Sequence, residues 1–360
     1  MDQTNDLPYW VAIAHFLKIG PTRWASLRSV FPTAKQIWEA DTSALINAGL
    51  EQNLAQEFIT YRHITNVEEK WLELEKLNIK VLTIIDDTYP ELLKQIFDPP
   101  VIIFYKGKVE ILSQPSLAVV GTRRATPYGL RVAHELVTQL AGAGLNIVSG
   151  LAYGVDAIAH RSCLLTGGAT VAVLACGLDN IYPIANQPLA DDIVMQGGVV
   201  LSEFPPHTAP LKQNFPYRNR IIAGLCQGTL VIEAAPGSGA LLTAKHALES
   251  NREVFTVPGS IFSDYSKGTN DLLKLGAHPV TQAEDVLNVF GLEAIAQKQR
   301  LPLNSEQEKF LQYFSHEPQQ IDELVRQSSL SAGEFMSQLT MLEMSGYVKE
   351  VGGQKYIKIN

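Results

Sequence analysis

Apolar and polar positions alternate along the chain with two different periods, and the change of period divides it into regions. Between residues 7 and 75, apolar side chains recur every three or four positions, as they do along one face of an amphipathic helix. We therefore expect a helical region without strands. Its predicted helices are Tyr9–Leu17, Thr22–Val30, Ala34–Trp38, Thr42–Asn47 and a long segment around Asn53–Leu77.

The turn Ile19-Gly20-Pro21 is typical of helix-hairpin-helix and SAM-like modules, some of which contact DNA through backbone amides. Only one glycine stands at this turn, which gives little support to the DNA-binding version. We expect these helices to serve as a scaffold or to dock a partner.

From Leu117 onward, short apolar runs alternate with amphipathic segments. This order is typical of a parallel sheet with helices on both faces, so we expect an α/β core. The predicted strands are Leu117–Val120, Asn146–Ser149, Thr170–Ala175, Val199–Ser202, Thr229–Ile232 and Glu253–Val257. The predicted helices are Tyr128–Ala141, Asp156–Leu165, Ala190–Met195, Arg218–Leu225 and Leu241–Ser250. Two earlier runs, Lys80–Ile85 and Val101–Lys106, should join the sheet from an edge.

The last part of the chain has the pattern of a winged helix. We expect helices over Leu303–Phe314, Ile321–Gln327 and Ser331–Ser345, and a wing formed by Val348–Val351 and Tyr356–Ile359. The third helix holds Glu334 and Glu343 but no Lys or Arg, so we expect it to contact protein rather than duplex DNA. The predicted division is a helical domain over 1–78, a sheet domain over 79–290, a linker over 291–302 and a winged helix over 303–360.

Composition limits the cellular compartment and the type of ligand that we expect for the protein. No apolar run is long enough to span a membrane, and the acidic N-terminus lacks the pattern of a signal peptide. The three cysteines are far apart and form no metal-ligand spacing, so we expect a cytoplasmic protein without disulfides or zinc. The net charge of −8 argues against a nucleic-acid partner, but residues 116–262 carry as many Lys and Arg as Asp and Glu. Any anion binding must therefore depend on local arrangement.

The stretch Ser116–Gly129 is the strongest candidate for such an arrangement. An apolar strand ends at Gly121, two arginines follow, and Thr126 stands where it caps a helix that begins with Pro127. Free backbone amides, the positive end of a helix dipole and guanidinium groups then converge, which predicts a phosphate site. The alternative is an ordinary turn with solvated arginines. The candidate residues here are Gly121, Thr122, Arg123, Arg124 and Thr126.

A second turn of this kind, Gly237–Thr243, opens another predicted helix, and the block FPYRNR lies between the two turns. Aromatic rings that stack bases, next to arginines that pair with phosphates, favour a flexible polynucleotide over one mononucleotide. The alternative is a buried helix in which Glu233 neutralises one arginine. The candidates are Lys212, Phe215, Arg218, Asn219, Arg220, Gly237, Ser238, Gly239, Thr243 and Lys245.

The sequence lacks the motifs of other common nucleotide-binding, hydrolytic and metal sites. No GxGxxG follows the first strand of the core, Walker A is absent, and no serine has the context of a nucleophile elbow. Asp156 and His160 are one helical turn apart, but no third metal ligand is evident. We expect them to form a hydrogen-bonded pair, with no metal and no cofactor.

Eight sequence blocks within residues 116–277 resemble the DNA-processing protein A (DprA/Smf) family. They are VGTRRATPYG, SGLAYGVDAIAH, LACGLDNIYPIAN, LSEFPP, FPYRNRIIAGL, VIEAAPGSGALLTA, EVFTVPGSIFS and KGTNDLLKLGA.

The resemblance implies an extended Rossmann-like core that binds single-stranded DNA without sequence preference, flanked by the helical and winged-helix domains. It further implies a dimer that protects incoming strands and loads the RecA recombinase, without catalysis. The phosphate contacts that it implies are Gly121, Thr122, Arg123, Lys212, Arg218, Asn219 and the Gly237–Thr243 turn. Two positions depart from the family pattern: Thr122 replaces a frequent serine, and Ile184 stands where some relatives have a basic residue.

The competing interpretation is an enzyme, because the same core is similar to nucleotide phosphoribohydrolases marked by PGGxGTxxE. Aligned on Pro236, that motif places Ala244 where the catalytic glutamate belongs, so the acid is missing. A third interpretation, a RecA-binding adaptor that does not touch DNA, leaves the arginine cluster unexplained.

Overall fold

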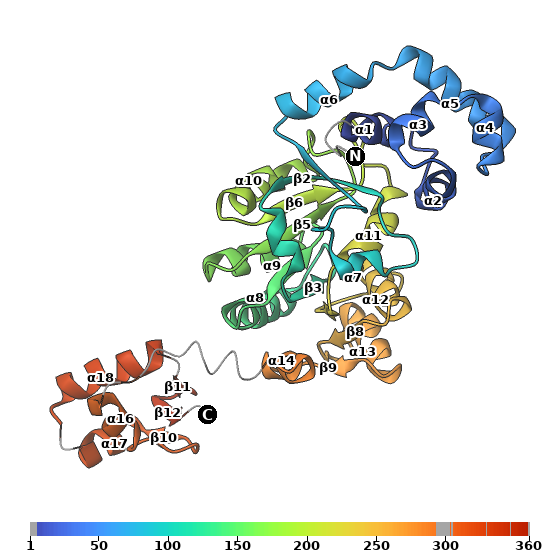
Figure 1. The fold of residues 1–360 in the computed structure, drawn as a ribbon. Coiled ribbons are helices and arrows are strands. Elements are labelled where there is room, and N and C mark those ends of the chain that lie inside the picture. The colour runs from blue at the N-terminus through green and yellow to red at the C-terminus, as the bar shows by residue number, and fades with distance from the viewer. Residues whose placement is uncertain (1–5, 293–302, 304, 329, 346, 359–360) are drawn as a thin grey trace. The chain divides into compact units, whose positions relative to one another are not determined.

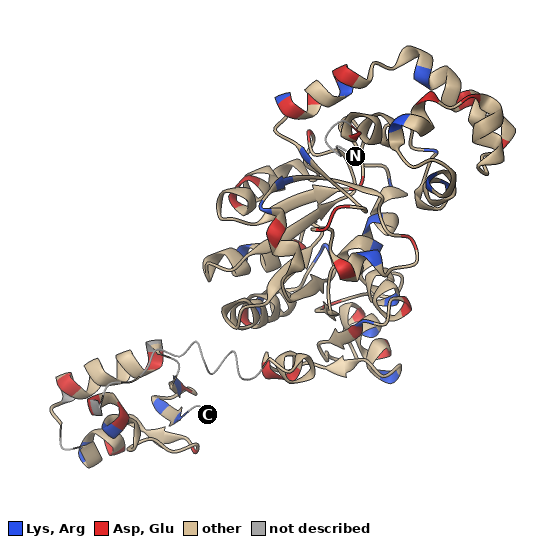
Figure 2. Cartoon of the chain, in the orientation of Figure 1, with Lys and Arg blue, Asp and Glu red and all other residues tan. Residues whose placement is uncertain are grey.

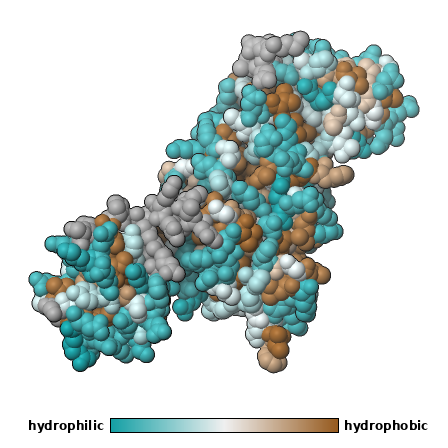
Figure 3. Space-filling model, turned by 60° about the horizontal axis from the view of Figure 1, so that its bottom comes forward, coloured by the Kyte–Doolittle hydropathy of each residue, from teal (hydrophilic) through white to brown (hydrophobic). Residues whose placement is uncertain are grey.

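The computed structural model describes residues 6–292, 303, 305–328, 330–345 and 347–358 (Figure 1). Two compact units divide the chain, Met1–Leu292 and Glu293–Asn360. The predicted linker, 291–302, lies outside the described residues from residue 293 onward. No helix among the described residues is long and apolar enough to cross a membrane, and the face seen in Figure 3 is mostly hydrophilic.

The first unit begins with the predicted helices. Their bounds are α1 Leu7–Ala14, α2 Pro21–Val30, α3 Ala34–Glu39, α4 Thr42–Asn47, α5 Gln52–Ile64 and α6 Val67–Lys76. The prediction of one long helix after Asn53 is wrong, because the chain leaves the helical conformation at Thr65. The Asn66 side chain then starts α6 by accepting hydrogen bonds from the amides of Glu68 (2.9 Å) and Glu69 (3.2 Å).

A nine-stranded sheet follows, with the order β1-β2-β6-β5-β4-β3-β7-β8-β9. Strands β3 to β9 run parallel, whereas β2 is antiparallel to both β1 and β6, so the two early strands do form one edge as predicted. The bounds are β1 Lys80–Thr83, β2 Ile102–Gly107, β3 Ser116–Val120, β4 Asn146–Ser149, β5 Thr170–Leu174, β6 Val199–Ser202, β7 Gly228–Val231, β8 Glu253–Thr256 and β9 His278–Pro279.

Helices cover both faces of this sheet, which confirms the α/β class (Figure 1). Val171 and Val173 of β5 pack toward α11 and α12, whereas Ala172 and Leu174 of the same strand pack toward α10. The alternation follows from the two-residue period of a strand. The bounds are α7 Glu91–Lys94, α8 Pro127–Gly142, α9 Val155–Leu165, α10 Gln187–Met195, α11 Asn214–Gly224, α12 Gly239–Glu249, α13 Lys267–Lys274 and α14 Glu284–Phe290, with short 3₁₀ turns η2 Val109–Ser113, η3 Ile184–Asn186 and η4 Asp264–Ser266.

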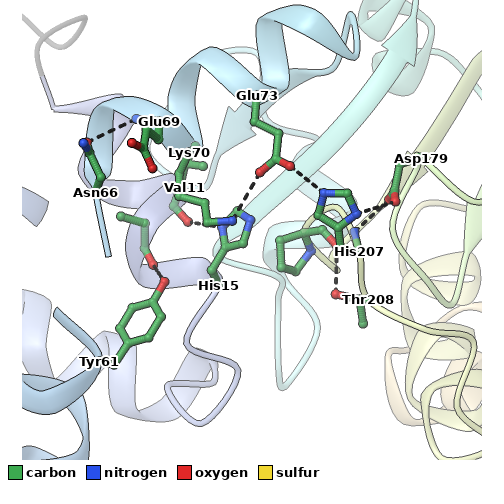
Figure 4. Close-up of polar contacts among 12 residues, drawn as sticks. Val11, His15, Tyr61, Asn66, Glu69, Lys70, Glu73, Asp179, His207 and Thr208 are labelled. Atoms are coloured by element: carbon green, nitrogen blue, oxygen red, sulfur yellow. Dashed lines mark hydrogen bonds and ion pairs between the residues drawn. The ribbon is translucent and has the colours of Figure 1, made fainter. Parts of the chain in front are cut away.

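The N-terminal helices are attached to the sheet by apolar burial and by one polar cluster. Their buried residues, including Trp10 and Phe58, belong to the same apolar cluster as Phe104 of β2. Beside it, the His207 side chain bridges the two parts: its Nε2 lies 2.5 Å from Glu73 of α6, and its Nδ1 lies 3.0 Å from Asp179 (Figure 4).

The second unit has the predicted winged-helix arrangement. Its helices are α16 Ser305–Leu311, α17 Ile321–Ser328 and α18 Ala332–Met344, and its sheet has the order β10-β12-β11, with β10 Gln319–Gln320, β11 Val348–Glu350 and β12 Lys355–Lys358. Phe310, Leu324 and Phe335 form its core together with Val348. The charged residues of α18 are all acidic, as Figure 2 shows.

Candidate functional site

The sheet places one crevice at a defined position. From β3 the chain moves through β4 and β5 to β6, and then returns to the other side of β3 to form β7. The loops after β3 and β7 therefore diverge, and in such sheets a ligand-binding crevice lies at that switch point. A cleft of about 880 Å³ occupies this position. The sequence-predicted residues that line it are Gly121, Thr122, Arg123, Arg124, Lys212, Phe215, Arg218, Asn219, Gly237, Ser238, Gly239 and Thr243.

The turn after β3 is held by its neighbours. The Thr122 amide donates to the Glu233 carbonyl (2.8 Å), and the Thr122 carbonyl accepts from the Val155 amide (3.3 Å). A Cβ at Gly121 would lie 2.5 Å from the Val155 side chain, so only glycine fits here. The turn is therefore fastened to the loops after β7 and β4.

Three cations stand exposed on this cleft: Arg123, Arg124 and Lys212. Within the described part of the chain, none of the three has a carboxylate partner. The Arg123 guanidinium lies 5.1 Å from the centre of the Phe215 ring, and that ring packs edge-to-face with Tyr182 at 5.7 Å between ring centres. The positive charge of these side chains is thus available to an external anion.

Arg218 differs from these cations because it is buried on the floor of the cleft. Its Nη1 donates to the carbonyls of Gly150 (2.9 Å) and Val173. Burial lowers the pKa of Arg218 to about 10, while the carboxylate of Asp156 opposes that shift. The guanidinium remains charged at neutral pH and supplies a fixed positive potential beneath the exposed cations.

The start of α12 forms the opposite wall. The Ser238 hydroxyl caps the helix by accepting from the Ala240 amide (3.3 Å), and the Asn219 side chain donates to the Gly239 carbonyl (3.1 Å). Gly237 has φ +75°, which glycine adopts without strain. Among the described residues, no acceptor pairs with the amides of Gly237 and Gly239. A helix N-terminus with free amides faces the cleft, an arrangement that favours anions.

The remaining sequence-predicted residues do not line the cleft. Thr126 caps α8 and donates through its amide (2.9 Å) and hydroxyl (2.6 Å) to the Glu233 carboxylate. Lys245 is exposed on α12 beside Glu249, at 3.6 Å. Arg220 is buried and donates to both oxygens of Glu203 at 2.7 Å. The expected neutralisation of an arginine by Glu233 is therefore wrong, because Glu203 does this and Glu233 holds the turn before α8.

Asp156 and His160 share α9, but the expectation that they bond to each other is wrong. Asp156 Oδ2 accepts from the Gly150 amide (3.1 Å) near the start of the helix, whereas His160 Nδ1 contacts the Thr170 hydroxyl (2.7 Å) on β5. Burial lowers the pKa of His160 to about 3, so its ring is neutral. In the described residues, no group of three His, Cys, Asp or Glu side chains is placed to hold a metal ion.

The sequence interpretation missed two features of the cleft. Tyr182, which is part of the block LACGLDNIYPIAN but not one of the predicted contact residues, packs against Phe215. Asp156 is the acidic residue on the cleft lining, and it balances Arg218. Its position in the first turn of a predicted helix, just after a glycine loop, was the available signal.

Comparison with known proteins gives one consistent family. Residues 80–291 match the model described as DNA recombination-mediator protein A, and residues 295–354 match the DprA winged helix domain. Protein Smf from Synechocystis is 33% identical over 98% of both chains. DNA processing protein DprA from Streptococcus pneumoniae is 44% identical over 62% of this chain and 79% of that protein.

Two solved structures are similar to this chain. DprA from Streptococcus pneumoniae superposes with a TM-score of 0.64 at 40% identity, covering 69% of this chain and 87% of that one. DNA processing protein A from Helicobacter pylori superposes with a TM-score of 0.54 at 32% identity, covering 59% and 95%. The Helicobacter pylori structure is described as giving insight into a single-stranded DNA binding mode of that protein.

Proposed function

Because the chain belongs to the DNA recombination-mediator protein A family, we propose that its cleft binds single-stranded DNA without sequence preference. The observation that carries this proposal is the convergence on one open cleft of three exposed cations, a buried arginine and two backbone amides at the start of α12, with no carboxylate partner for the cations and no acceptor for the amides among the described residues. The single-stranded DNA binding mode described for the Helicobacter pylori relative supports the same substrate.

The groups on the cleft suit a backbone more than a base edge. Guanidinium, ammonium and backbone amides neutralise phosphates, and they carry no sequence information. Arg123 and Lys212 are the proposed phosphate contacts, with the Gly237 turn as a further anion site. Phe215 offers an aromatic surface for stacking, which every base satisfies.

The proposal further includes the family's wider role. The bound strand would be protected and delivered to RecA, in the cytoplasm, by a homodimer. Neither step requires a chemical reaction by this chain, and we propose that it is not an enzyme. Ala244, buried on α12 where the phosphoribohydrolase motif has its glutamate, supports this view.

The test is a titration of the protein with fluorescently labelled oligo-dT. Unlabelled duplex DNA and AMP are then added as competitors, and the AMP sample is analysed for released adenine. We expect oligo-dT to bind, duplex to compete weakly and AMP not to compete. If each exposed cation neutralises one phosphate, log affinity falls by about 2 for each log unit of added salt. Equal binding of duplex and single strands, or adenine released from AMP, would overturn the proposal.

A further inference from the structure

A second groove adjoins the cleft and shares a wall with it. This groove, of about 470 Å³, is lined by Arg123 and Arg124, the two residues that also line the cleft. The groove continues past them between the start of α8 and one face of α9. An extended ligand that occupies the cleft and passes these two arginines therefore enters the second groove.

One side of α9 forms the floor of this groove. Gly154, Ala157, Ile158 and Arg161 all line it, and their spacing of three and four residues places them on a single helix face. The first two are small, so the groove stays open near the turn after β3. A Cβ at Gly154 would lie 2.4 Å from the Thr122 carbonyl, so glycine is required for this close approach of the two loops.

Arg161 gives the groove its chemical character. Its side chain is exposed, and within the described residues it has neither an ion pair nor a hydrogen bond. In the part of the chain that the structure describes, no acidic side chain lines the groove, in contrast to the cleft, where Asp156 accompanies Arg218. Unpaired arginines in a groove without carboxylates favour an anionic ligand.

Tyr153 gives the second groove an exposed aromatic side chain. This residue is 48% exposed, lies in the short loop between β4 and α9, and lines the same groove as Arg161. The groove holds an exposed aromatic residue and an exposed arginine, the same two types of side chain that meet in the cleft as Phe215 and Arg123. The cleft and the second groove thus each offer an aromatic surface and at least one exposed cation.

We propose that the second groove is a continuation of the DNA-binding path, in which Arg161 contacts a phosphate and Tyr153 stacks on a base. This inference rests on the proposed function, because it extends the strand held in the cleft. The ligand is a single-stranded polynucleotide longer than the cleft alone accommodates. A free mononucleotide would not need the shared wall of Arg123 and Arg124.

The experiment compares the full chain and its variants on oligo-dT of about 5 and about 16 nucleotides, lengths that bracket typical site sizes. For the longer strand, Arg161→Ala should reduce the salt slope by about 0.7, and Tyr153→Ala should weaken binding about fivefold or more. Neither variant should change binding of the short strand. Arg161→Lys should keep the salt slope, and Lys274→Ala, which removes an exposed cation lining neither groove, is the matched control.

The outcomes separate this inference from the proposed function. If Arg123→Ala weakens binding of both strands while Arg161→Ala changes binding of neither, the cleft remains the binding site and the proposed extension is overturned. If Arg161→Ala lost equal affinity for the short and the long strand, the extension would also be overturned. If the unaltered chain binds neither strand, the proposed function itself fails. Unfolding midpoints followed by tryptophan fluorescence show whether each variant is folded.

Discussion

Replacing Arg220 by methionine tests whether this arginine serves the fold rather than an external phosphate. Arg220 and Glu203 are 8% and 11% exposed, and the carboxylate accepts from Nη2 at 2.7 Å. The guanidinium also lies 4.0 Å from the centre of the Tyr217 ring. Asp98, the other acidic neighbour at 3.5 Å, is 24% exposed and remains partly hydrated without Arg220. Arg220→Met therefore leaves Glu203 as the buried, unpaired charge.

The expected cost is about 3–5 kcal/mol of unfolding free energy at neutral pH, the range for breaking a buried ion pair from one side. Burial raises the pKa of Glu203, and the positive charge of Arg220 opposes that rise. The substitution removes the opposing charge, so the folded variant holds a proton to higher pH than the unfolded chain does. Its stability consequently falls as pH rises, by at most about 1.4 kcal/mol per pH unit.

Urea denaturation at about pH 5 and pH 7 measures this difference. All four tryptophans lie in the N-terminal helices of the first unit, so their fluorescence follows that unit without a signal from the winged helix. We expect the stability gap between the unaltered chain and Arg220→Met to narrow at the lower pH. In a Glu203→Gln background, Arg220→Met should change the unfolding free energy by an amount that does not depend on pH, because the titrating carboxyl is gone. A gap under about 1 kcal/mol at pH 7, or one independent of pH in the single variant, would refute the reasoning.

Two further predictions concern the contacts around the site. Gly129→Ala places a Cβ 2.2 Å from Glu233 Oε2, and the displaced carboxylate should cost about 1–3 kcal/mol of stability, measured by urea denaturation; an unchanged midpoint would contradict this packing. His207 has a raised pKa because of its hydrogen bond to Glu73. The protonated ring therefore stabilises the folded first unit fully below the ordinary pKa of histidine, and this stabilisation is lost as pH rises through the pKa of His207 in the folded protein. His207→Gln should remove that pH dependence from the unfolding of the first unit, and a pH profile parallel to that of the unaltered chain would contradict it.

The regular part of the fold could be predicted from local pattern. The strands Asn146–Ser149 and Val199–Ser202 have the bounds that the sequence predicts, because continuous apolar runs mark strands buried on both faces. Helix α11 begins at Asn214, four residues before the predicted start. The reason is tertiary: the buried Asn214 side chain donates to the carbonyl of Ala175 (3.2 Å) at the end of β5.

The location of the candidate site could also be predicted, but whether each of its cations is exposed or buried could not. Glycine turns at the ends of strands β3 and β7 identify the cleft, since topology brings those ends together. Whether an arginine is exposed or buried depends on partners far away in the sequence. Arg218 is held by Gly150 and Val173, and Arg220 by Glu203. No local pattern distinguishes these two from Arg123.

The most direct test of the central claim is the salt dependence of oligo-dT binding by the double variant Arg123→Ala with Lys212→Ala. Both side chains are exposed and unpaired in the described structure, so the variant should unfold at the same urea concentration as the unaltered chain. We predict a large loss of affinity and a reduction of the salt slope by about 1.4, the value for two phosphates. Unchanged affinity at low salt would contradict the claim that this cleft binds single-stranded DNA.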